Sequence, residues 1–292
     1  MIESTLRPFR RLQLVTCIVA MLAVTASLAM AQETSANDPG STAFMRGDYA
    51  LAMQEWSRKA QVGDAEAMNN IGILYNKGLG VDRDASMAAG WYRRSAELGF
   101  ANAQFNLANL LYSGDGVDRD LRQSAAWYHE AAKRNHLGAQ YFLGLMYADG
   151  EGVPQDKMEA LKWIVKAADS GNAVAQYEVG RMLVGGDGLQ PDPVKGAEYT
   201  LKSAHAGNAK ASLLMAQLYA AGKGAEQNDI EAYVWARIAA DRLKPGQDSR
   251  KAHALIDELE ARLEEGAIKA AERVIQIRNP KPDTEGEAPP PQ

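Results

Sequence analysis

Small and apolar residues recur along this chain with a fixed step of 36 residues, beginning near Asp64. Alanine occupies one position of this step five times: Ala67, Ala103, Ala139, Ala175 and Ala211. Two glycine positions recur in the same way: Gly78, Gly114, Gly150, Gly186 and Gly222, and also Gly80, Gly116, Gly152, Gly188 and Gly224. Five copies in strict phase, without insertion or deletion, indicate a repeat protein.

The first half of each repeat has the periodicity of an amphipathic helix. Ala67, Ile71, Leu74 and Tyr75 follow the spacing i, i+4, i+7 and i+8, which places them on one helical face. Gly78 is expected to end this helix, because the residue after the last turn often needs a positive φ, which glycine adopts at least cost. The pattern therefore predicts a first helix and then a tight loop.

The second half of each repeat predicts another helix. Asp84 can cap its start, and in the fourth copy Pro193 follows Asp192 at the first helical position, where its missing N–H costs nothing. The expected packing face of this helix is Ala88, Trp91, Ser95 and Ala96, with Gly99 at its end. Each repeat is thus helix, loop, helix and turn, and the predicted fold class is all-α, an α-α superhelix.

The residues that identify a family in the first copy are Ala67, Ile71, Gly72, Tyr75, Gly78, Gly80, Val81, Asp84, Ala88, Trp91, Ser95, Ala96 and Gly99. This pattern resembles the Sel-one-like repeat (SLR), a relative of the tetratricopeptide repeat (TPR) with a longer loop inside the helix pair. The resemblance covers residues 42–278 and implies a TPR-like α-solenoid of bacterial secreted or periplasmic type. Five full repeats are expected near 64–99, 100–135, 136–171, 172–207 and 208–243.

The beginning of the chain has the pattern of a secretory signal peptide. Residues 1–31 carry a basic start and the apolar run 12–30, and small residues precede a cleavage site after Ala31. Cleavage gives a periplasmic or secreted protein. The alternative is that residues 12–30 remain as a membrane anchor, since this run approaches the length of a span. Residues 32–41 are expected to form a polar linker.

The regions on both sides of the repeats are predicted to cap them. Residues 42–63 match the second half of a repeat, with Asp48 in register and Trp56 one place out of register with Trp91. The solenoid itself is expected over residues 64–245.

The C-terminal region predicts a lid and a tail. Residues 246–278 predict two capping helices separated at Gly266, because an exposed last repeat needs a lid. Residues 279–292 contain five prolines and are expected to be disordered.

Charge and cysteine content exclude several classes of function. Removal of residues 1–31 takes away three arginines, one glutamate and Cys17, so the formal net charge changes from −5 to −7 and no cysteine remains. Disulfides and thiol catalysis are then excluded. A general nucleic-acid binder, or a membrane binder beyond the export signal, is not expected from an acidic chain.

The chain offers little that predicts catalysis. Its histidines, His129, His136, His205 and His253, occupy unrelated repeat positions, and His129 has no second histidine four residues on. No spacing of metal ligands is present, and the recurring glycines are explained by turns. We therefore expect no catalytic residue, no metal, no cofactor and no enzymatic activity.

The remaining candidate is a groove lined by the first helices, which face the concave side in TPR proteins. The residues expected to bind a partner there are Phe105, Asn109, Tyr112, Tyr141, Leu145, Tyr177, Arg181 and Gln217. Aromatic rings provide contact area, and amides can satisfy the main chain of a peptide or partner helix. Phe105, Tyr141 and Tyr177 share one repeat position, so a role in the core is an equal alternative for that column.

Resemblance to SLR proteins implies a protein–protein interaction scaffold. We expect it to bind an envelope protein or peptide, in signalling or polysaccharide control at the cell envelope. One alternative is a β-lactam-binding or hydrolysing enzyme, as among cysteine-rich SLR proteins, whose paired cysteines this chain lacks. Another alternative is a peptidoglycan or glycan binder that uses the groove aromatics. The sequence predicts neither the partner nor the oligomeric state.

Overall fold

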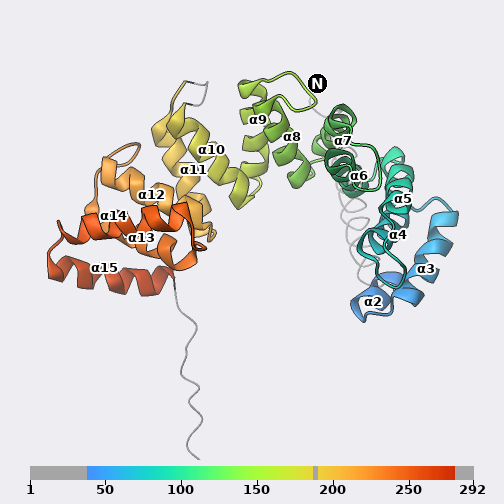
Figure 1. Ribbon diagram of the computed structural model, residues 1–292, viewed down its shortest axis with the longest axis horizontal. Coiled ribbons are helices and arrows are strands. Elements are labelled where there is room, and N and C mark those ends of the chain that lie inside the picture. Colours follow the sequence, from blue (N-terminus) through green and yellow to red (C-terminus); the bar gives the residue numbers. More distant parts are fainter. Residues whose placement is uncertain (1–37, 187–189, 280–292) are drawn as a thin grey trace, which may run out of the picture. The chain divides into compact units, whose positions relative to one another are not determined.

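The computed structural model describes residues 38–186 and 190–279, and all of its regular elements there are helices (Figure 1). The predicted signal peptide and most of the predicted tail lie outside the described residues. None of the helices in the described residues combines the length and the hydrophobicity needed to cross a bilayer. The fold class predicted from the repeat pattern is confirmed.

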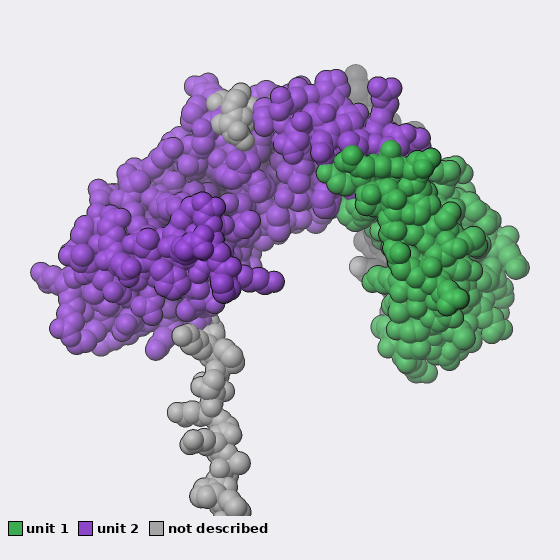
Figure 2. Space-filling model, viewed as in Figure 1, with its two compact units in different colours: residues 1–119 green, residues 120–292 purple. Residues whose placement is uncertain are grey.

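The chain divides into two compact units, which we describe separately (Figure 2). Unit 1 ends at Arg119 and contains α2 (Pro39–Met45), α3 (Tyr49–Gln61), α4 (Ala65–Lys77), α5 (Ala85–Glu97) and α6 (Ala101–Ser113). Unit 2 begins at Asp120 with α7 (Leu121–Lys133), α8 (Leu137–Asp149), α9 (Lys157–Asp169), α10 (Ala173–Gly185) and α11 (Pro193–His205). It continues with α12 (Ala209–Ala221), α13 (Asp229–Arg242), α14 (Gln247–Glu260) and α15 (Glu265–Arg278).

The predicted start and stop signals of the helices are confirmed. Gly78 ends α4 in the left-handed region at φ 67°, and the equivalent glycine ends α6, α8, α10 and α12. Asp84 accepts a hydrogen bond from the Met87 N–H at the start of α5 (2.8 Å), and an aspartate or asparagine does the same in the other second helices. The local sequence therefore fixes where each helix begins and ends.

In each repeat the second helix packs closely against a glycine or alanine of the first helix. A Cβ at Gly72 would lie 2.6 Å from the Tyr92 ring, so the absence of a side chain lets this ring pack directly on α4. Tyr92 is fully buried, whereas Trp91 is half-buried under the guanidinium of Arg94 at 4.6 Å. Trp91 therefore packs against the core cluster as predicted, and its equivalents Trp163 and Trp235 are buried, but the centre of the helix pair is filled by its neighbour Tyr92, which the sequence analysis did not name.

The burial of Tyr92 also explains the offset of Trp56. Trp56 lies 36 residues before Tyr92, so these two residues occupy the same repeat position, and both are buried. Along this column the buried side chain shrinks toward the C-terminus: Trp56, Tyr92, Tyr128, Ile164, Thr200 and Ala236. The N-terminal segment therefore packs as a repeat does.

The N-terminal cap is larger than the sequence predicted. Helix α2 begins at Pro39, with Asp38 as its N-cap, so the last three residues of the predicted linker 32–41 are helical. Its interior carries Ala43, which is buried with Trp56 in one apolar cluster. Residues 38–63 are therefore a helix pair with a shortened first helix rather than half a repeat.

The C-terminal lid consists of the two predicted helices, both packed on α13. The chain turns at residues 261–264, and Gly266 lies in the first turn of α15. The prediction that Gly266 breaks the two helices was therefore wrong by a few residues. Arg242 donates two hydrogen bonds to Asn279 Oδ1 (2.8 and 3.1 Å), which ties the end of α15 to α13.

Candidate partner-binding face

Within each unit the first helices of neighbouring repeats approach one another. Helix α4 contacts α6 in unit 1, while α10 contacts α12 and α12 contacts α14 in unit 2. No comparable contact joins the second helices α9 and α11, or α11 and α13, in the described part of the chain. Closer spacing on one side favours a concave surface there, and we call the side formed by the first helices the inner face of each unit.

Three repeat positions on this side, which begin at Glu66, Asn70 and Ile73, are called the inner columns. All of their residues are exposed or half-buried. The inner face of unit 1 consists of Glu66, Asn70 and Ile73 on α4 and Asn102, Asn106 and Asn109 on α6. The inner face of unit 2 consists of Gly138, Phe142 and Leu145 on α8, Val174, Glu178 and Arg181 on α10, and Lys210, Leu214 and Gln217 on α12. These residues differ between repeats, whereas the buried alanine column does not.

Amide side chains dominate the inner face of unit 1. Asn106 Nδ2 donates to Asn69 Oδ1 (2.9 Å), and Asn69 Nδ2 donates to Asn70 Oδ1 (3.2 Å). Asn69 is buried, so this chain of amides links α6 to α4 from below the surface. The linked amides are held in fixed orientations, which favours recognition of groups that both donate and accept hydrogen bonds.

The inner face of unit 2 combines exposed apolar side chains with charged ones. The side chain of Phe142 is 38% exposed, stacks on Tyr128 with ring centroids 5.7 Å apart, and meets the edge of Tyr141 at 5.6 Å. Val174 is 49% exposed on the neighbouring first helix. Apolar side chains that remain exposed around rigid rings are typical of surfaces that bind other proteins.

One ion pair lies within this surface. Arg181 Nε donates to Glu178 Oε2 at 3.0 Å along α10. Burial raises the pKa of the Tyr141 and Tyr177 hydroxyls, Glu178 raises it further, and Arg181 acts in the opposite direction. Both tyrosines therefore stay neutral at physiological pH and can donate or accept a hydrogen bond.

The structure places the predicted groove residues in two groups. Phe105, Asn109 and Tyr112 lie on α6 in unit 1, whereas the other five lie on first helices of unit 2: Tyr141, Leu145, Tyr177, Arg181 and Gln217. Tyr112 is at the loop end of α6, where the Arg119 guanidinium lies 5.8 Å from its ring centroid.

The aromatic column of the predicted groove lies at the edge of the core. Phe105, Tyr141 and Tyr177 are half-buried, while Asn69 and Leu213 in the same column are fully buried. That column therefore contributes both to packing and to the surface.

Sequence reasoning missed one of the three inner columns. Phe142, Asn106 and Glu178 share it; Phe142 is exposed, and Asn106 and Glu178 are half-buried like the aromatic column beside them. The 36-residue step carried the signal, because Asn70, Asn106, Phe142, Glu178 and Leu214 vary in type from one repeat to the next. Variation in a column of a regular repeat indicates that packing does not dictate the residue.

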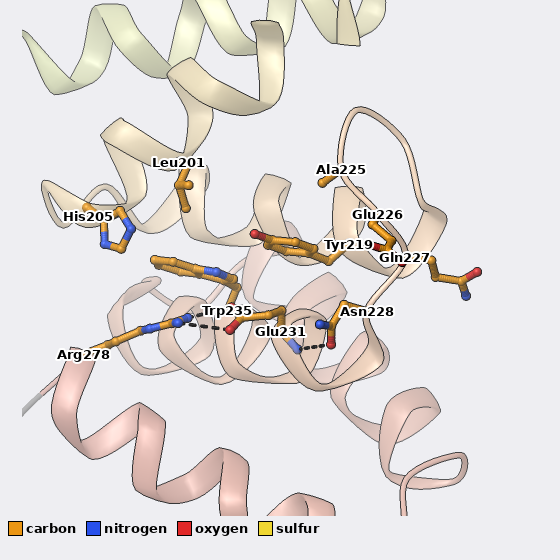
Figure 3. A pocket seen from close by; sticks show the side chains of 10 residues that line it. All are labelled: Leu201, His205, Tyr219, Ala225, Glu226, Gln227, Asn228, Glu231, Trp235 and Arg278. Carbon is orange, nitrogen blue, oxygen red and sulfur yellow. Dashed lines mark hydrogen bonds and ion pairs between the residues drawn. The ribbon is translucent and has the colours of Figure 1, made fainter. Parts of the chain in front are cut away.

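A polar pocket of about 530 Å³ lies at the C-terminal end of unit 2 (Figure 3). Arg278 donates two hydrogen bonds to Glu231 (2.7 and 3.0 Å), and its guanidinium lies 5.4 Å from the centroid of the Trp235 ring. His205 meets the edge of the same ring at 5.2 Å. These contacts join α11, α13 and α15, so the residues of this pocket hold the lid on the last repeat.

The histidines have structural surroundings. His136 caps α8 by accepting a hydrogen bond from the Ala139 N–H at its Nδ1 (3.0 Å), and burial lowers its pKa, so the ring is neutral. His129 packs edge-on against Trp163 at 5.6 Å. No group of three or more histidine, cysteine or acidic side chains that could hold a metal is found among the residues that the structure describes.

Comparison with known families decides the classification. The model of the Sel1 repeat matches residues 65–100, 101–136, 138–172, 173–208 and 209–242, which together make up more than half of the chain. The chain belongs to the Sel1 repeat family. Sel1 repeats generally mediate protein–protein interaction, and proteins built from them are typically scaffolds without enzymatic activity.

The chain is also similar to several solved structures. A Sel1 repeat protein from Oxalobacter formigenes is 28% identical, with a TM-score of 0.68 over 77% of this chain and 98% of that one. A putative Sel1 repeat protein from Klebsiella pneumoniae is 20% identical (TM-score 0.44, 71% and 99% covered). The immunity protein PA5088 of Pseudomonas aeruginosa is 19% identical (TM-score 0.41, 77% and 83% covered). A search of curated proteins found no match.

Proposed function

We propose that this Sel1 repeat protein is an exported scaffold that binds a protein or peptide of the cell envelope on its inner faces. One observation carries the proposal. The inner column that begins at Ile73 continues as Asn109, Leu145, Arg181 and Gln217, all exposed or half-buried, whereas the buried column at Ala67 is alanine in every repeat. Packing requires alanine at the position of Ala67 but leaves the residue at the position of Ile73 free to vary. The column that begins at Ile73 is therefore available for recognition.

The inner face of unit 2 is the main candidate for contact with the partner. The exposed Phe142 ring and the exposed Val174 side chain supply apolar area, and the Arg181–Glu178 pair supplies charge on the same face. Central arginine and aromatic residues supply most of the binding energy in many interfaces. We therefore expect a partner that covers Phe142 and Val174 and that places an acidic or polar group at Arg181.

Crosslinking in whole cells followed by mass spectrometry tests this proposal. Arg181→Glu should reduce capture of the partner about tenfold or more, because a truncated or reversed hot-spot charge costs 1–3 kcal/mol or more. Lys195→Glu on α11 is the matched control: it makes the same charge change at an exposed position outside the inner columns. Equal capture by both variants would place the binding surface elsewhere, and capture of peptidoglycan alone would replace the proposal with a glycan-binding function.

The export part of the proposal rests on residues 1–31. Their basic start, apolar run and small residues before Gln32 are the features of a cleaved signal. Fractionation of the producing cells and sequencing of the protein's N-terminus should give a periplasmic protein that begins at Gln32. An intact N-terminus in the membrane fraction would instead support an anchor formed by residues 12–30.

A further inference from the structure

A second surface, in unit 1, has a pocket of about 250 Å³ where the N-terminal cap meets the first repeat. Phe44, Met45 and Trp56 line it from α2 and α3, and Ile73 lines it from α4. Met45 is 75% exposed, so the pocket opens to solvent along an apolar wall. Its volume suits one bulky apolar side chain and is small for a drug-sized ligand, whose sites span roughly 300–1,000 Å³.

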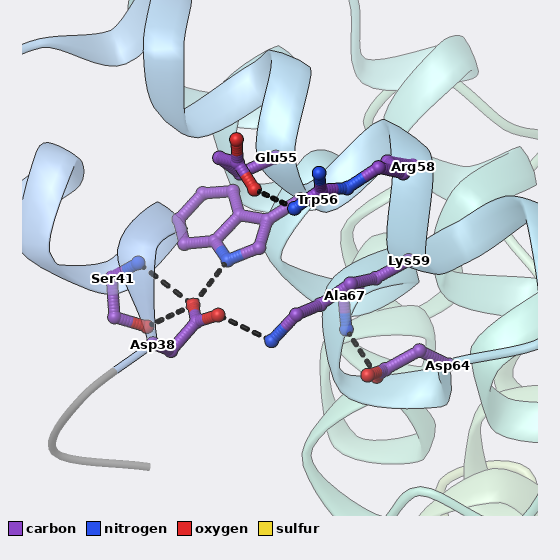
Figure 4. Close-up of polar contacts among 8 residues, drawn as sticks. All are labelled: Asp38, Ser41, Glu55, Trp56, Arg58, Lys59, Asp64 and Ala67. Atoms are coloured by element: carbon purple, nitrogen blue, oxygen red, sulfur yellow. Dashed lines mark hydrogen bonds and ion pairs between the residues drawn. The ribbon is translucent and has the colours of Figure 1, made fainter. Parts of the chain in front are cut away.

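Polar contacts around Asp38 hold Trp56, which forms one wall of the pocket (Figure 4). Trp56 Nε1 donates to Asp38 Oδ2 at 3.0 Å, and the same carboxylate accepts from the Ser41 N–H at 2.8 Å and from Lys59. The hydrogen bond to Asp38 therefore holds the Trp56 ring in place. The Phe44 ring packs on it with ring centroids 5.7 Å apart. A rigid wall lowers the entropy lost on binding, which favours tight capture of a small anchor.

Three α4 residues of the pocket have equivalents in the next repeat. Glu66 and Asn70 form its polar rim together with Ser41, and Ile73 stands beside them on the same face of α4. One step of 36 residues carries these three α4 positions to an uninterrupted set of amides on α6: Asn102, Asn106 and Asn109. Because α4 and α6 are in contact, the pocket and the amides form one surface within unit 1.

The chemistry of this surface defines its occupant. Amide side chains donate and accept at once, which matches the N–H and C=O groups of an extended main chain. Glu66 is exposed in the first turn of α4, and its carboxylate favours a basic residue beside the anchor. Neighbouring helices pack roughly 8–10 Å apart and an extended peptide rises about 3.3 Å per residue, so about three residues join the pocket to the amides.

We propose that the inner face of unit 1 binds an extended peptide segment that inserts one bulky apolar side chain between Trp56 and Ile73 and carries a lysine or arginine next to it. This inference rests on the proposed function, because it names the chemistry of a partner for one of the two inner faces. It also assigns the surface around α2 and α3 to binding, in addition to its role as a cap.

Selection of peptides from a random library displayed on phage, with the purified protein as bait, tests the inference. Selected sequences should share an apolar residue, and a basic residue should stand beside it. Synthetic, fluorescein-labelled copies should then lose about tenfold or more in affinity for Ile73→Arg, because a charged group would enter the apolar pocket. Arginine is tolerated at this repeat position, since Arg181 occupies it in α10.

Matched variants separate this inference from the proposed function. Leu145→Arg makes the equivalent change on the inner face of unit 2 and should leave the affinity of these peptides within twofold. Asn106→Leu, which places the residue of Leu214 in this column, should weaken binding of every selected peptide alike, because it removes contacts to the main chain. If the selected peptides responded to Leu145→Arg and not to Ile73→Arg, the inference would fall and the scaffold function would stand. If no peptide and no crosslinked partner were recovered, both would fall.

Discussion

The inner face of unit 1 and the inner face of unit 2 use the same repeat positions for different chemistry. In unit 1 they carry three asparagines on α6 beside an apolar pocket, whereas in unit 2 they carry exposed Phe142 and Val174 around an ion pair. The buried alanine column and the capping residues of the second helices are nearly unchanged between the two units. In this fold, stability and recognition are therefore assigned to different positions of one 36-residue period.

The largest expected effect comes from a loop glycine that recurs in both units and packs against the neighbouring helix. We call these recurring glycines and helix caps the repeat frame. A Cβ at Gly116 would lie 2.4 Å from the Ala85 carbonyl carbon, and one at Gly152 would lie 2.2 Å from the Leu121 carbonyl oxygen, both at positive φ. Gly116→Ala and Gly152→Ala should each lower the free energy of unfolding by about 3 kcal/mol, because strain at φ adds to a clash with backbone. Denaturant titration followed by circular dichroism measures this loss.

Gly114→Ala is the control for the frame prediction. Its φ is 76°, but its Cβ would meet only Arg119 Cβ at 3.2 Å, so it should cost about 1 kcal/mol from backbone strain alone. Equal losses for Gly114→Ala and Gly116→Ala would show that the close approach between the loop and the neighbouring helix contributes nothing. A difference between Gly116→Ala and Gly152→Ala would show that the two units do not share one frame.

The next effect concerns unit 1 alone and depends on pH. Burial raises the pKa of Asp38, but hydrogen bonds from Lys59, Ser41 and Trp56 outweigh it and hold the pKa well below its ordinary value. The ionised form is therefore favoured by folding. Its contribution to stability is complete above an unfolded pKa of about 4 and is lost as the pH falls below it. Asp38→Asn should lower the free energy of unfolding at neutral pH by about 2 kcal/mol.

The pH profile is the decisive readout for Asp38. Thermal unfolding of the parent protein should become easier below about pH 4, and Asp38→Asn should flatten that part of the profile. Ser41→Ala is the control, since it removes only the hydroxyl hydrogen bond (2.9 Å) and keeps the charge. An unaltered acid transition in Asp38→Asn would mean that other carboxylates govern it. The variant should also weaken peptide binding in the unit 1 pocket, because Trp56 loses a charged acceptor.

The repeat frame could be predicted from the sequence because its signals are local. A glycine at positive φ and a capping aspartate act through backbone groups a few residues away, so Gly78 and Asp84 have the same meaning in every repeat. Even Asn135, the substitute for glycine after α7, has the expected positive φ of 62°. Fold class and helix order therefore followed from residue spacing.

The features that sequence reasoning missed depend on contacts between helices. Adjacent Trp91 and Tyr92 both fit an apolar face, and the contact of the Tyr92 ring with Gly72 on the other helix, which the sequence does not show, places Tyr92 deeper than Trp91. Phe142 was missed as a surface residue because an aromatic at helical spacing is usually core. Helix α2 was missed because its stability comes from Asp38 and Trp56, which are 18 residues apart. Three of the eight predicted groove residues lay in the aromatic column, whose partial burial no periodicity could show.

A smaller effect tests the apolar character of unit 2. Phe142→Asn copies the residue found at Asn106 in unit 1 and should lower the free energy of unfolding by about 1 kcal/mol, since the stacking on Tyr128 is lost. Denaturant titration measures this change, and partner capture should fall with it. Val174→Asn is the control on the same face, and because Val174 is largely exposed it should change stability by less than about 0.5 kcal/mol. A stability-neutral Phe142→Asn would mean that the ring serves recognition alone.

The smallest effect is expected at a position that joins neighbouring repeats in both units. Gln104 Nε2 donates to the Ala96 carbonyl (3.1 Å) in unit 1, and Gln140 Nε2 donates to the Ala132 carbonyl (3.2 Å) in unit 2. In each glutamine the Oε1 atom is buried without a hydrogen-bond partner. The favourable bond of the amide is therefore offset by the cost of its unsatisfied oxygen.

Gln140→Met should consequently change the free energy of unfolding by less than about 0.5 kcal/mol, because methionine fills the same volume and removes the unsatisfied oxygen. The Ala132 carbonyl keeps a second donor, the Asn135 N–H at 3.0 Å, and Met68 already occupies this position in the first repeat. Gln140→Ala is the control, which leaves a cavity and should cost about 2 kcal/mol. Denaturant titration of Gln104→Met and Gln140→Met should give the same small value. A loss above about 2 kcal/mol in either would show that the amide, rather than the packed volume, joins the repeats.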